Sequence, residues 1–363
     1  MNKKICLLLL TISLFIASCQ AETPTLVLQT QQATTEVVEA QEPQILKVMT
    51  HDSFAVSEEV MSAFEDQYNI KIEILFSGDT GTALNKAILS KGNPLADVFY
   101  GVDNTFLSRA LEEDIFEVYT SPLLSEIPDQ FKLDLQMRAL PVDFGDVCLN
   151  YDKLYFTEMD ISPPENLEDL LNPEYRSLLV VENPATSSPG LAFLLATIGH
   201  FGEDGYLDFW RGLVENDVLI VNDWETAYYT EFSRSGGTRP VVVSYASSPS
   251  FEVIYADPPI EEPPTEAITS DGSCFRQIEF VGILKGTQNR NLAEKWVDFM
   301  LSTTFQEDIP LQMFVFPVNE NAQLDDAFTK HLSVPDKPAF VTPEDIAANR
   351  EKWIQEWTET ILR

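Results

Sequence analysis

The sequence predicts an α/β protein built from two lobes. Segments with strand-like and helix-like patterns alternate almost throughout the chain, and such alternation is typical of mainly parallel sheets covered by helices. Once the N-terminal segments are set aside, about 320 residues remain, which is enough for two lobes. Several polar loops follow predicted strands, where ligands of α/β proteins gather. A binding cleft is therefore part of the expectation.

The N-terminus predicts a lipoprotein signal peptide over residues 1–18. Two lysines precede an apolar stretch over residues 7–16 that is too short to span a bilayer. The next residues, Ile16-Ala17-Ser18-Cys19, resemble the bacterial lipobox, in which the cysteine is acylated and becomes the new N-terminus. We expect a lipid on Cys19 that holds the mature chain outside the cytoplasm, at the cell membrane. Plain secretion with an incidental cysteine is the alternative.

Residues 19–44 are expected to form a flexible tether behind that lipid. The segment is rich in Thr, Gln, Glu and small aliphatic residues, has no aromatic residue and shows no helical period. Such a composition cannot bury a core. A flexible segment of this length reaches roughly 25–30 Å on average, which suits a body that moves above a membrane.

The expected strands are short apolar runs rich in β-branched and aromatic residues. The fourth is the longest and is interrupted by Gly145. In chain order the strands cover residues 46–50, 71–76, 97–100, 140–150, 178–182, 218–221, 240–245 and 277–284.

The expected helices are segments in which apolar residues recur every three or four positions. The first has Val60, Phe64 and Tyr68 on one stripe, and the last has Trp353 and Trp357 on one packing face. Prolines at positions 258, 259, 263 and 264 predict an exposed loop. In chain order the helices cover residues 57–68, 82–90, 104–112, 191–198, 291–301 and 342–362.

Four loops are candidates for ligand binding because they follow strands, and ligands gather at strand carboxyl ends and helix N-termini. In two of them Pro189 and Pro249 each follow a serine, as expected for a helix N-cap with proline at the first helical position. Ordinary helix capping explains any one loop, but four in one exported chain favour a cleft. The loops cover residues 50–54, 77–82, 186–190 and 245–249.

The stretch from Trp224 to Phe251 has the composition of a wall for a flat polar ligand. Trp224-Glu225 and Tyr228-Tyr229 precede a strand-like run of three valines, after which hydroxyl residues and Phe251 follow. Aromatic rings can enclose a planar ligand while hydroxyl and amide groups orient it. An ordinary core strand between two helices is the alternative reading.

Charge and motifs argue against several classes of protein. The formal net charge of −35 argues against nucleic acid as a partner. It agrees with a cationic ligand drawn in by a negative field, and equally with a need for solubility. The chain has no nucleophile elbow, His-Glu-x-x-His motif or Walker loop, and His51, His200 and His331 are widely separated. We therefore predict no catalytic residue and no metal site, and we favour a binding protein that closes by hinge bending over an exported enzyme.

Two cysteines remain in the body of the protein. Cys6 leaves with the signal peptide and Cys19 carries the lipid, so Cys148 and Cys274 are left. In an exported protein this pair can form a disulfide, or it can stay as two buried thiols.

Residues 46–363 resemble the thiamine-binding substrate-binding proteins of bacterial ABC importers. The resemblance rests on motifs whose order and spacing agree with few gaps. They are Asp52-Ser53-Phe54, Ala96-Asp97-Val98, Gly101-Val102-Asp103-Asn104, Pro141-Val142-Asp143-Phe144-Gly145, Tyr151-Asp152-Lys153, Thr186-Ser187-Ser188-Pro189-Gly190-Leu191, Trp224-Glu225-Thr226-Ala227-Tyr228, Ser244-Tyr245, Ser248-Pro249, Phe316-Pro317-Val318, and Thr342-Pro343-Glu344 with Trp353 and Trp357.

The resemblance implies a two-lobed periplasmic-binding-protein-like fold of type II, with a hinge of crossing strands and a cleft between the lobes. It implies that residues 45–143 form the first lobe and residues 144–280 the second. Residues 281–363 then complete the first lobe and add C-terminal helices. The implied ligand is thiamine or its mono- or diphosphate, with no other cofactor, and the implied partners are the permease and ATPase subunits of an ABC transporter.

The resemblance also implies a set of ligand-binding residues. Asp79 with Thr80 matches an acidic site, Ser187 with Ser188 matches a hydroxyl pair at a helix start, and Trp224 matches a ring-contacting tryptophan. The helix near Ser188 is expected to offer free amides that would suit a phosphate. The full expected set is His51, Asp52, Asp79, Thr80, Ser187, Ser188, Trp224, Tyr245, Ala246, Ser247, Ser248 and Phe251.

An iron(III)-binding importer protein of the same fold is the alternative to a thiamine-binding one. Such proteins are implied to use adjacent tyrosines as ligands, and Tyr228-Tyr229 could mimic that pair. We expect Tyr229 to be a scaffold residue on a helix face instead. Trp224 just upstream favours an organic ring.

Overall fold

The computed structural model describes residues 44–361. The expected signal peptide, the expected lipid site at Cys19 and nearly all of the expected tether fall outside the described residues. Gln44, the last residue assigned to that tether, begins the first strand.

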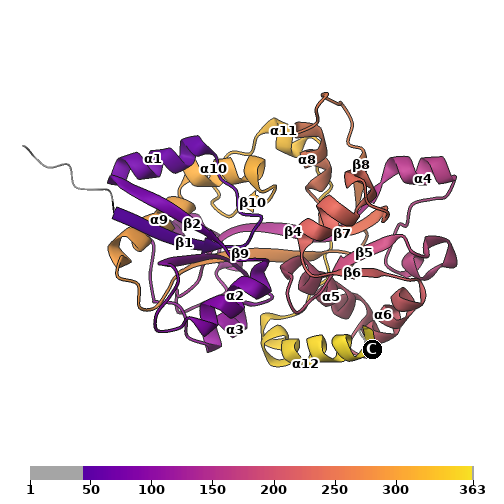
Figure 1. The fold of residues 1–363 in the computed structure, drawn as a ribbon, viewed down its shortest axis with the longest axis horizontal. Helices are drawn as coiled ribbons and strands as arrows, with labels where there is room; N and C mark the ends of the chain where they lie inside the picture. Colours follow the sequence, from indigo (N-terminus) through magenta and orange to yellow (C-terminus); the bar gives the residue numbers. More distant parts are fainter. Residues whose placement is uncertain (1–43, 362–363) are drawn as a thin grey trace, which may run out of the picture. The chain divides into compact units, whose positions relative to one another are not determined.

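One mixed sheet of ten strands organises the described chain (Figure 1). All eight expected strands are present, and two short ones, β8 and β10, were not predicted. The strand order is β2-β1-β3-β9-β4-β7-β5-β6, with β8 and β10 also paired to β4. The strands are β1 (Gln44–Thr50), β2 (Ile70–Phe76), β3 (Val98–Asp103), β4 (Leu140–Asp152), β5 (Leu179–Glu182), β6 (Leu219–Val221), β7 (Val241–Tyr245), β8 (Thr265–Ile268), β9 (Phe275–Ile283) and β10 (Phe316–Pro317).

The prediction of mainly parallel sheets is correct for the two flanks of the sheet and wrong for its middle. β1 pairs in parallel with β2 and β3, and β5 pairs in parallel with β6 and β7. In the middle, β4 and β9 run antiparallel to each other. β4 is also antiparallel to β7, and β9 is also antiparallel to β3. Strand direction depends on the path of the connections, and an apolar run in the sequence does not record that path.

β4 and β9 form the hinge of crossing strands that the resemblance implied. They are long, with 13 and 9 residues, and each pairs with the other. β9 continues into pairing with β3, whereas β4 continues into pairing with β7 and β8. Both strands therefore belong to the two halves of the sheet at once, and they connect the two lobes (Figure 1).

The helices cover this sheet, and every expected helix is present with ends shifted by a few residues. In the described part of the chain, no helix combines the length and the apolar character that a bilayer crossing requires. The helices are α1 (Glu58–Tyr68), α2 (Thr80–Leu89), α3 (Leu107–Glu112), α4 (Lys153–Met159), α5 (Ser188–Phe201), α6 (Tyr206–Glu215), α7 (Trp224–Thr226), α8 (Ser248–Ile254), α9 (Arg290–Leu301), α10 (Thr303–Gln312), α11 (Asp326–Thr329) and α12 (Pro343–Ile361).

α5 is buried over its first eleven residues, and its first turn lies on the end of β5. The run from Ser188 to Ile198 is buried, as expected for a helix that is apolar on nearly all sides. The N-cap of α5 is Ser187, whose hydroxyl accepts a hydrogen bond from the amide of Gly190. Pro189 is therefore the second residue of the helix, whereas the sequence predicted it to be the first. A side chain at Gly190 would place Cβ 2.6 Å from the carbonyl oxygen of Glu182, so glycine permits this close approach.

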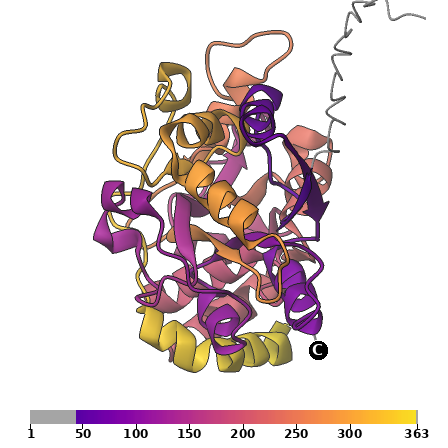
Figure 2. The same ribbon diagram turned by 90° about the vertical axis from the view of Figure 1, so that its left-hand side faces the viewer.

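α12 contacts both halves of the described chain. Trp353 and Trp357 are buried, which confirms their predicted packing face. The Trp357 ring meets that of Trp210 on α6 edge-on, with ring centroids 5.5 Å apart. The Arg350 guanidinium lies 5.2 Å from the ring centroid of Phe106, just before α3. In Figure 2, α12 runs in yellow beneath the indigo and magenta helices.

A buried disulfide joins the two hinge strands. Cys148 of β4 and Cys274, which directly precedes β9, are bonded with an S–S distance of 2.10 Å. The antiparallel register pairs Val147 with Phe275, so the two cysteines face each other one position further along. Of the two alternatives left open by the sequence, the structure shows the disulfide.

Candidate functional site

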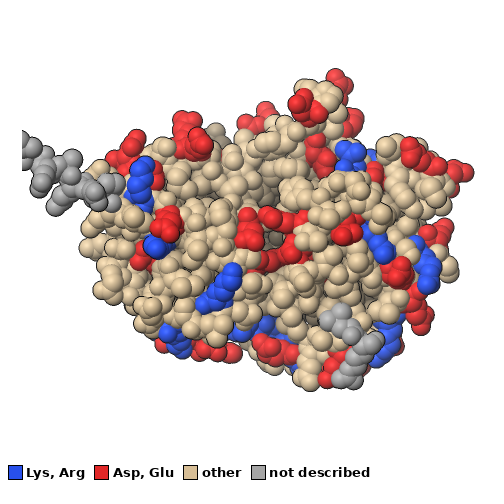
Figure 3. Space-filling view, viewed as in Figure 1, with Lys and Arg blue, Asp and Glu red and all other residues tan. Residues whose placement is uncertain are grey.

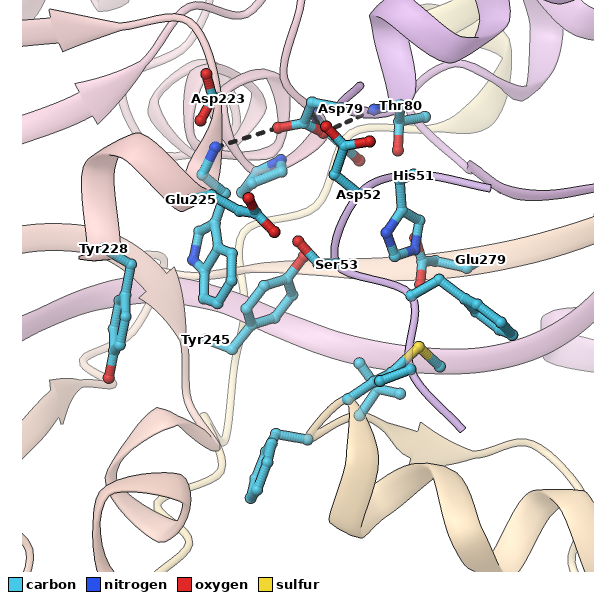
Figure 4. A pocket seen from close by; sticks show the side chains of 18 of the residues that line it. His51, Asp52, Ser53, Asp79, Thr80, Asp223, Glu225, Tyr228, Tyr245 and Glu279 are labelled. Carbon is cyan, nitrogen blue, oxygen red and sulfur yellow. Dashed lines mark hydrogen bonds and ion pairs between the residues drawn. The ribbon is translucent and has the colours of Figure 1, made fainter. Parts of the chain in front are cut away.

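A pocket of about 320 Å³ lies between the two halves of the sheet (Figure 4). The loops after β1 and β2 line it from one half, and the starts of α5, α7 and α8 line it from the other. β9 and the segment that joins α10 to β10 complete the lining. Its volume falls at the lower end of the range for sites that enclose a small organic molecule.

Asp79 connects both sides of this pocket. As the N-cap of α2, its Oδ1 accepts a hydrogen bond from the amide of Thr80 at 2.7 Å. The same oxygen accepts from the amide of Ser188 at 3.3 Å, and Oδ2 accepts from the amide of Trp224 at 3.3 Å. Burial raises the pKa of Asp79, while its hydrogen bonds with Ser187, Thr80 and Ser188 oppose that rise. One carboxylate thus ties the first turns of α2, α5 and α7 together.

Aromatic rings form the wall on the α7 and α8 side. Trp224 stacks on Tyr228, with centroids 5.2 Å apart and 20° between the planes. Its indole N–H donates to the Ser244 hydroxyl at 3.0 Å, which fixes the orientation of the ring. Tyr245 stands at an angle of 67° to Trp224, and the Phe251 ring continues the wall. The arrangement leaves aromatic surface facing the pocket from more than one direction.

A buried group of titratable side chains lies behind the lining residues His51 and Glu279. The Tyr100 hydroxyl lies 2.6 Å from Asp143 Oδ2 and 3.0 Å from Glu279 Oε2. Burial and the neighbouring Glu279 raise the pKa of Asp143 well above its usual range, which favours its protonated form. Glu279 Oε1 is 3.4 Å from His51 Nε2. Burial raises the pKa of Glu279, but the His51 charge and hydrogen bonds bring it below its usual value.

The carboxylates near His51 favour the charged form of its imidazole. Burial alone lowers the pKa of its imidazole, but the carboxylates of Glu279, Asp79 and Asp52 raise it above its ordinary value. At 3.4 Å from Glu279 Oε1, a protonated His51 offsets the charge of the Glu279 carboxylate within the pocket.

A chain of hydrogen bonds links Ser188 to the aromatic wall. The Ser188 hydroxyl donates to Asp103 Oδ2 and accepts from Gln277 Nε2 at 2.7 Å. The Tyr245 hydroxyl in turn donates to Gln277 Oε1 at 3.1 Å. The chain runs from β3 through α5 and β9 to β7, so it crosses from one half of the sheet to the other.

The pocket is acidic. Five carboxylates line it, and none of its lining residues is Lys or Arg. Asp223 caps α7 through the amide of Thr226 at 2.7 Å, and Asp52 accepts from the amide of Gly78 at 2.7 Å. Glu225 is exposed, and its pKa is raised by partial burial and by Asp52, Asp223 and Asp79. In Figure 3, acidic side chains gather around a hollow in the middle of this face.

Nine of the twelve residues expected at the site line the pocket, and three do not. Ser187 is turned inward as the cap of α5. Ala246 is buried against the disulfide, and Ser247 donates its hydroxyl to the carbonyl oxygen of Phe314. The helix start near Ser188 was expected to offer free amides, but the Ser188 N–H donates to Asp79 and the Gly190 N–H donates to the Ser187 hydroxyl. The nine lining residues are His51, Asp52, Asp79, Thr80, Ser188, Trp224, Tyr245, Ser248 and Phe251.

Several lining residues were absent from the sequence prediction. Glu225 and Tyr229 lie beside Trp224, so the aromatic and acidic run around it was the available signal. Gln277 and Glu279 face the pocket from β9, and only the alternation along that strand could have indicated them. Phe314 comes from a connection more than sixty residues after Phe251, and no local pattern brings the two rings to their 4.8 Å separation.

Tyr228 and Tyr229 do line the pocket, so the interpretation of Tyr229 as a helix-face scaffold is incomplete. Tyr228 is buried and its hydroxyl donates to Glu252 at 2.9 Å, whereas Tyr229 is exposed. Burial, with Glu252 for Tyr228 and Glu225 for Tyr229, raises the pKa of both phenols. Within residues 44–361, no group of three or more His, Cys, Asp or Glu side chains could hold a metal ion.

The sequence is similar to bacterial solute-binding proteins over most of its length. A family profile described as bacterial extracellular solute-binding protein matches residues 93–348. The chain is 29% identical to the thiamine-binding periplasmic protein of Salmonella typhimurium over 326 residues, covering 88% of this chain and 94% of the relative. It is 28% identical to the protein of that name from Escherichia coli over 324 residues, with the same coverage.

Comparison with solved structures gives the same fold. A periplasmic thiamin-binding protein aligns with a TM-score of 0.77 at 26% identity, covering 89% of this chain and 98% of that one. AfuA from Actinobacillus pleuropneumoniae, with fructose-6-phosphate bound, aligns at 0.73 and 22% identity, covering 88% and 99%. A ferric-binding protein from Campylobacter jejuni aligns at 0.69 and 18% identity, covering 87% and 99%. The last two similarities concern the fold alone.

Proposed function

The chain belongs to the bacterial extracellular solute-binding proteins, and we propose that it binds thiamine and delivers it to an ABC importer. The family has a binding role outside the cytoplasm, which agrees with the absence of catalytic motifs noted in the sequence. The names of its relatives support thiamine as the ligand. The pocket supplies the physical argument.

The observation that carries this proposal is an aromatic wall facing a group of carboxylates in a pocket without Lys or Arg. Thiamine joins an aminopyrimidine ring to a cationic thiazolium ring. Aromatic faces attract both flat rings and fixed cations, with about 0.5–2 kcal/mol for each contact. Carboxylates add a complementary field and accept hydrogen bonds from the amino group.

We assign roles to individual residues on that basis. Trp224, Tyr245 and Phe251 contact the rings, and Ser188 and Ser248 orient polar groups at their edges. Asp52 and Asp79, together with Glu225, supply the negative field for the thiazolium. His51, Thr80 and Gln277 set the positions of these groups. Ser187, Ala246 and Ser247 support the pocket from behind it.

We propose that closure around the ligand bends β4 and β9, with lobe boundaries near residues 143–144 and 280–281. Asp143 and Glu279 are paired across these strands, and Glu279 lines the pocket. Asp79 and Ser188 meet from opposite halves, so opening the cleft would break their hydrogen bond.

Iron(III) is the weaker candidate. Adjacent Tyr228 and Tyr229 at the pocket favour it. Ferric ion binds the phenolate, however, and burial beside carboxylates raises the pKa of both phenols. Tyr228 is also engaged by Glu252 and stacked under Trp224, so it would have to move to reach a metal.

Tryptophan fluorescence tests the proposed function. Trp210, Trp296, Trp353 and Trp357 are buried in the core, and Trp224 is the tryptophan that lines the pocket. Thiamine should quench part of the emission of the wild-type protein, and Trp224→Phe should remove that quenching. Unchanged wild-type emission, together with no heat of binding, would reject thiamine as the ligand.

We also propose that Cys19 carries a lipid anchor behind a removed signal peptide. The lipobox-like Ile16-Ala17-Ser18-Cys19 supports this. In cells fed labelled palmitate, the wild-type protein should be labelled and fractionate with membranes. A Cys19→Ser variant that is labelled to the same extent would contradict the anchor.

A further inference from the structure

We propose that the disulfide between Cys148 and Cys274 positions the aromatic wall of the pocket and thereby raises the affinity for thiamine. Neither cysteine lines the pocket, so both act through other residues. The inference rests on the proposed function and adds two positioning residues to it. The wall concerned is the one that Trp224 and Tyr245 form.

Cys148 lies beside the residue that orients the Trp224 ring. In the antiparallel pairing of β4 and β7, Cys148 is directly opposite Ser244. Side chains of such a pair are neighbours on one face of the sheet. The Ser244 hydroxyl accepts a hydrogen bond from the indole N–H of Trp224 at 3.0 Å and lies 2.8 Å from the Ser248 hydroxyl. A shift of Cys148 relative to β7 would therefore move the group that fixes the indole.

Ala246 packs on the disulfide at the point where β7 is followed by α8. Ala246, Cys148 and Cys274 form a small buried cluster of their own, apart from the main core. Ala246 directly follows Tyr245 and precedes Ser248 by two positions, and both of these residues line the pocket. The disulfide thus supports the short segment that carries two lining residues.

The end of β7 depends on β4 for its position. β5 pairs with β7 at Val241 and Val242. Within residues 44–361, the ladder partner found for Ser244 and Tyr245 is β4 alone. Because Cys148 belongs to this stretch of β4, fixing Cys148 also restricts the end of β7.

Cys274 connects the same cluster to β9. The ladder between β4 and β9 ends at the pair Val147 and Phe275, and the disulfide is the next link beyond that pair. Gln277 follows on β9, lines the pocket and accepts a hydrogen bond from the Tyr245 hydroxyl at 3.1 Å. The bond therefore holds the wall from two strands at once. Contacts between rings depend on their relative placement, so a loosened wall should bind a planar ligand less tightly.

Calorimetric titration of the purified protein with thiamine tests the inference on wild type, Cys148→Ala/Cys274→Ala and Leu213→Ala. Leu213 is buried on α6 and does not line the pocket. Its truncation is the matched control, because loss of a core side chain and loss of a disulfide typically destabilise a protein to a similar degree. At a temperature where all three proteins are folded, we expect the double variant to bind about 10-fold more weakly and Leu213→Ala to stay within about 2-fold of wild type.

The fluorescence of Trp224 reports on the wall directly. Subtracting the spectrum of the same protein with Trp224→Phe isolates its emission in each background. We expect this emission to shift to the red in the double cysteine variant, because the indole is held less firmly at Ser244 and meets more water. Leu213→Ala should show no such shift. A disulfide that served stability alone would not change this signal in the folded protein.

The inference is overturned by a folded double variant that binds thiamine as tightly as wild type, or whose Trp224 emission is unshifted. An equal loss of affinity in Leu213→Ala would also reject it, since lower stability would then explain the effect. If wild type does not bind thiamine, the proposed function fails, and the Trp224 emission alone decides whether the disulfide positions the wall. Should the double variant not fold, Cys274→Ala, which keeps the Cys148 side chain opposite Ser244, must still weaken binding.

Discussion

The carboxylate of Asp79 accepts a hydrogen bond from the backbone N–H of Trp224, with Oδ2 and N 3.3 Å apart. These residues lie 145 positions apart, on opposite sides of the pocket. The other oxygen of Asp79 binds the first amide of its own helix and the amide of Ser188. Asp79 thus contacts both sides of the pocket, and it binds the backbone of the tryptophan in the pocket wall.

Replacement of Asp79 should separate helix capping from cleft closure. Asp79→Ala removes the cap of α2, and we expect the free energy of unfolding to fall by about 1 kcal/mol. Asp79→Asn keeps an acceptor for the cap but loses the charge, so stability should change less. Both variants should weaken thiamine binding, because the amides of Ser188 and Trp224 lose a charged acceptor. Urea unfolding and calorimetry measure the two effects.

Asp325→Ala is the matched control for Asp79→Ala. Asp325 caps α11 through the amide of Ala327 at 2.7 Å and does not line the pocket. It should lower stability without changing the affinity for thiamine. Wild-type affinity in Asp79→Ala would show that the carboxylate acts only as a cap.

The disulfide should contribute substantially to stability. Cys148 and Cys274 are 126 positions apart, and a cross-link over such a span restricts the unfolded chain strongly. We expect Cys148→Ala/Cys274→Ala to unfold with a free energy lower by about 2–4 kcal/mol. The comparison is made by urea unfolding without reductant. An unchanged unfolding midpoint, or two free thiols in the native oxidised protein, would contradict a structural disulfide.

Asp103 should make the stability of the protein depend on pH. Burial raises the pKa of its carboxyl to about 7, although hydrogen bonds from Ser188 and Thr105 lower it. The folded protein therefore holds this proton at pH values where the unfolded chain has lost it. The contribution of Asp103 to the free energy of unfolding is fully present below about pH 4, near the pKa of an aspartate in the unfolded chain. It is lost as the pH rises towards 7, by at most about 1.4 kcal/mol for each pH unit.

Asp103→Asn isolates this contribution, since the amide cannot titrate. Between pH 4 and 7 the variant should lose less stability than the wild type, as measured by urea unfolding at each pH. Parallel stability curves for the two proteins would show that the Asp103 carboxyl is not protonated in the folded state.

Much of the fold follows from periodicity in the sequence. The apolar stripe that contains Phe64 predicts α1, and the apolar run after Ser188 predicts α5. The spacing of Trp353 and Trp357 predicts the packing face of α12. The antiparallel middle of the sheet was not predictable in this way. β9 joins the sheet far along the chain from β3 and β4, and its direction depends on the intervening connections rather than on its own apolar residues.

The site was predictable in composition and less so in detail. The polar loops at Asp79 and Ser188 do meet, because the carboxyl ends of strands in both halves face the same pocket. Neighbouring residues such as Ser187 and Ser247 point elsewhere, since a hydroxyl at a helix start can serve either as a cap or as a lining group. Phe314 was missed because its contact with Phe251 is long-range.

A calorimetric comparison of three ligands on wild-type protein and Trp224→Ala tests the central claim most directly. Thiamine, ferric citrate and fructose-6-phosphate represent the chemistry of the three structural relatives. The account predicts that thiamine alone binds the wild type, at one molecule per chain, and that Trp224→Ala weakens this binding by about 10-fold or more. Binding of iron or the sugar phosphate without thiamine, or unchanged thiamine affinity in Trp224→Ala, would contradict it.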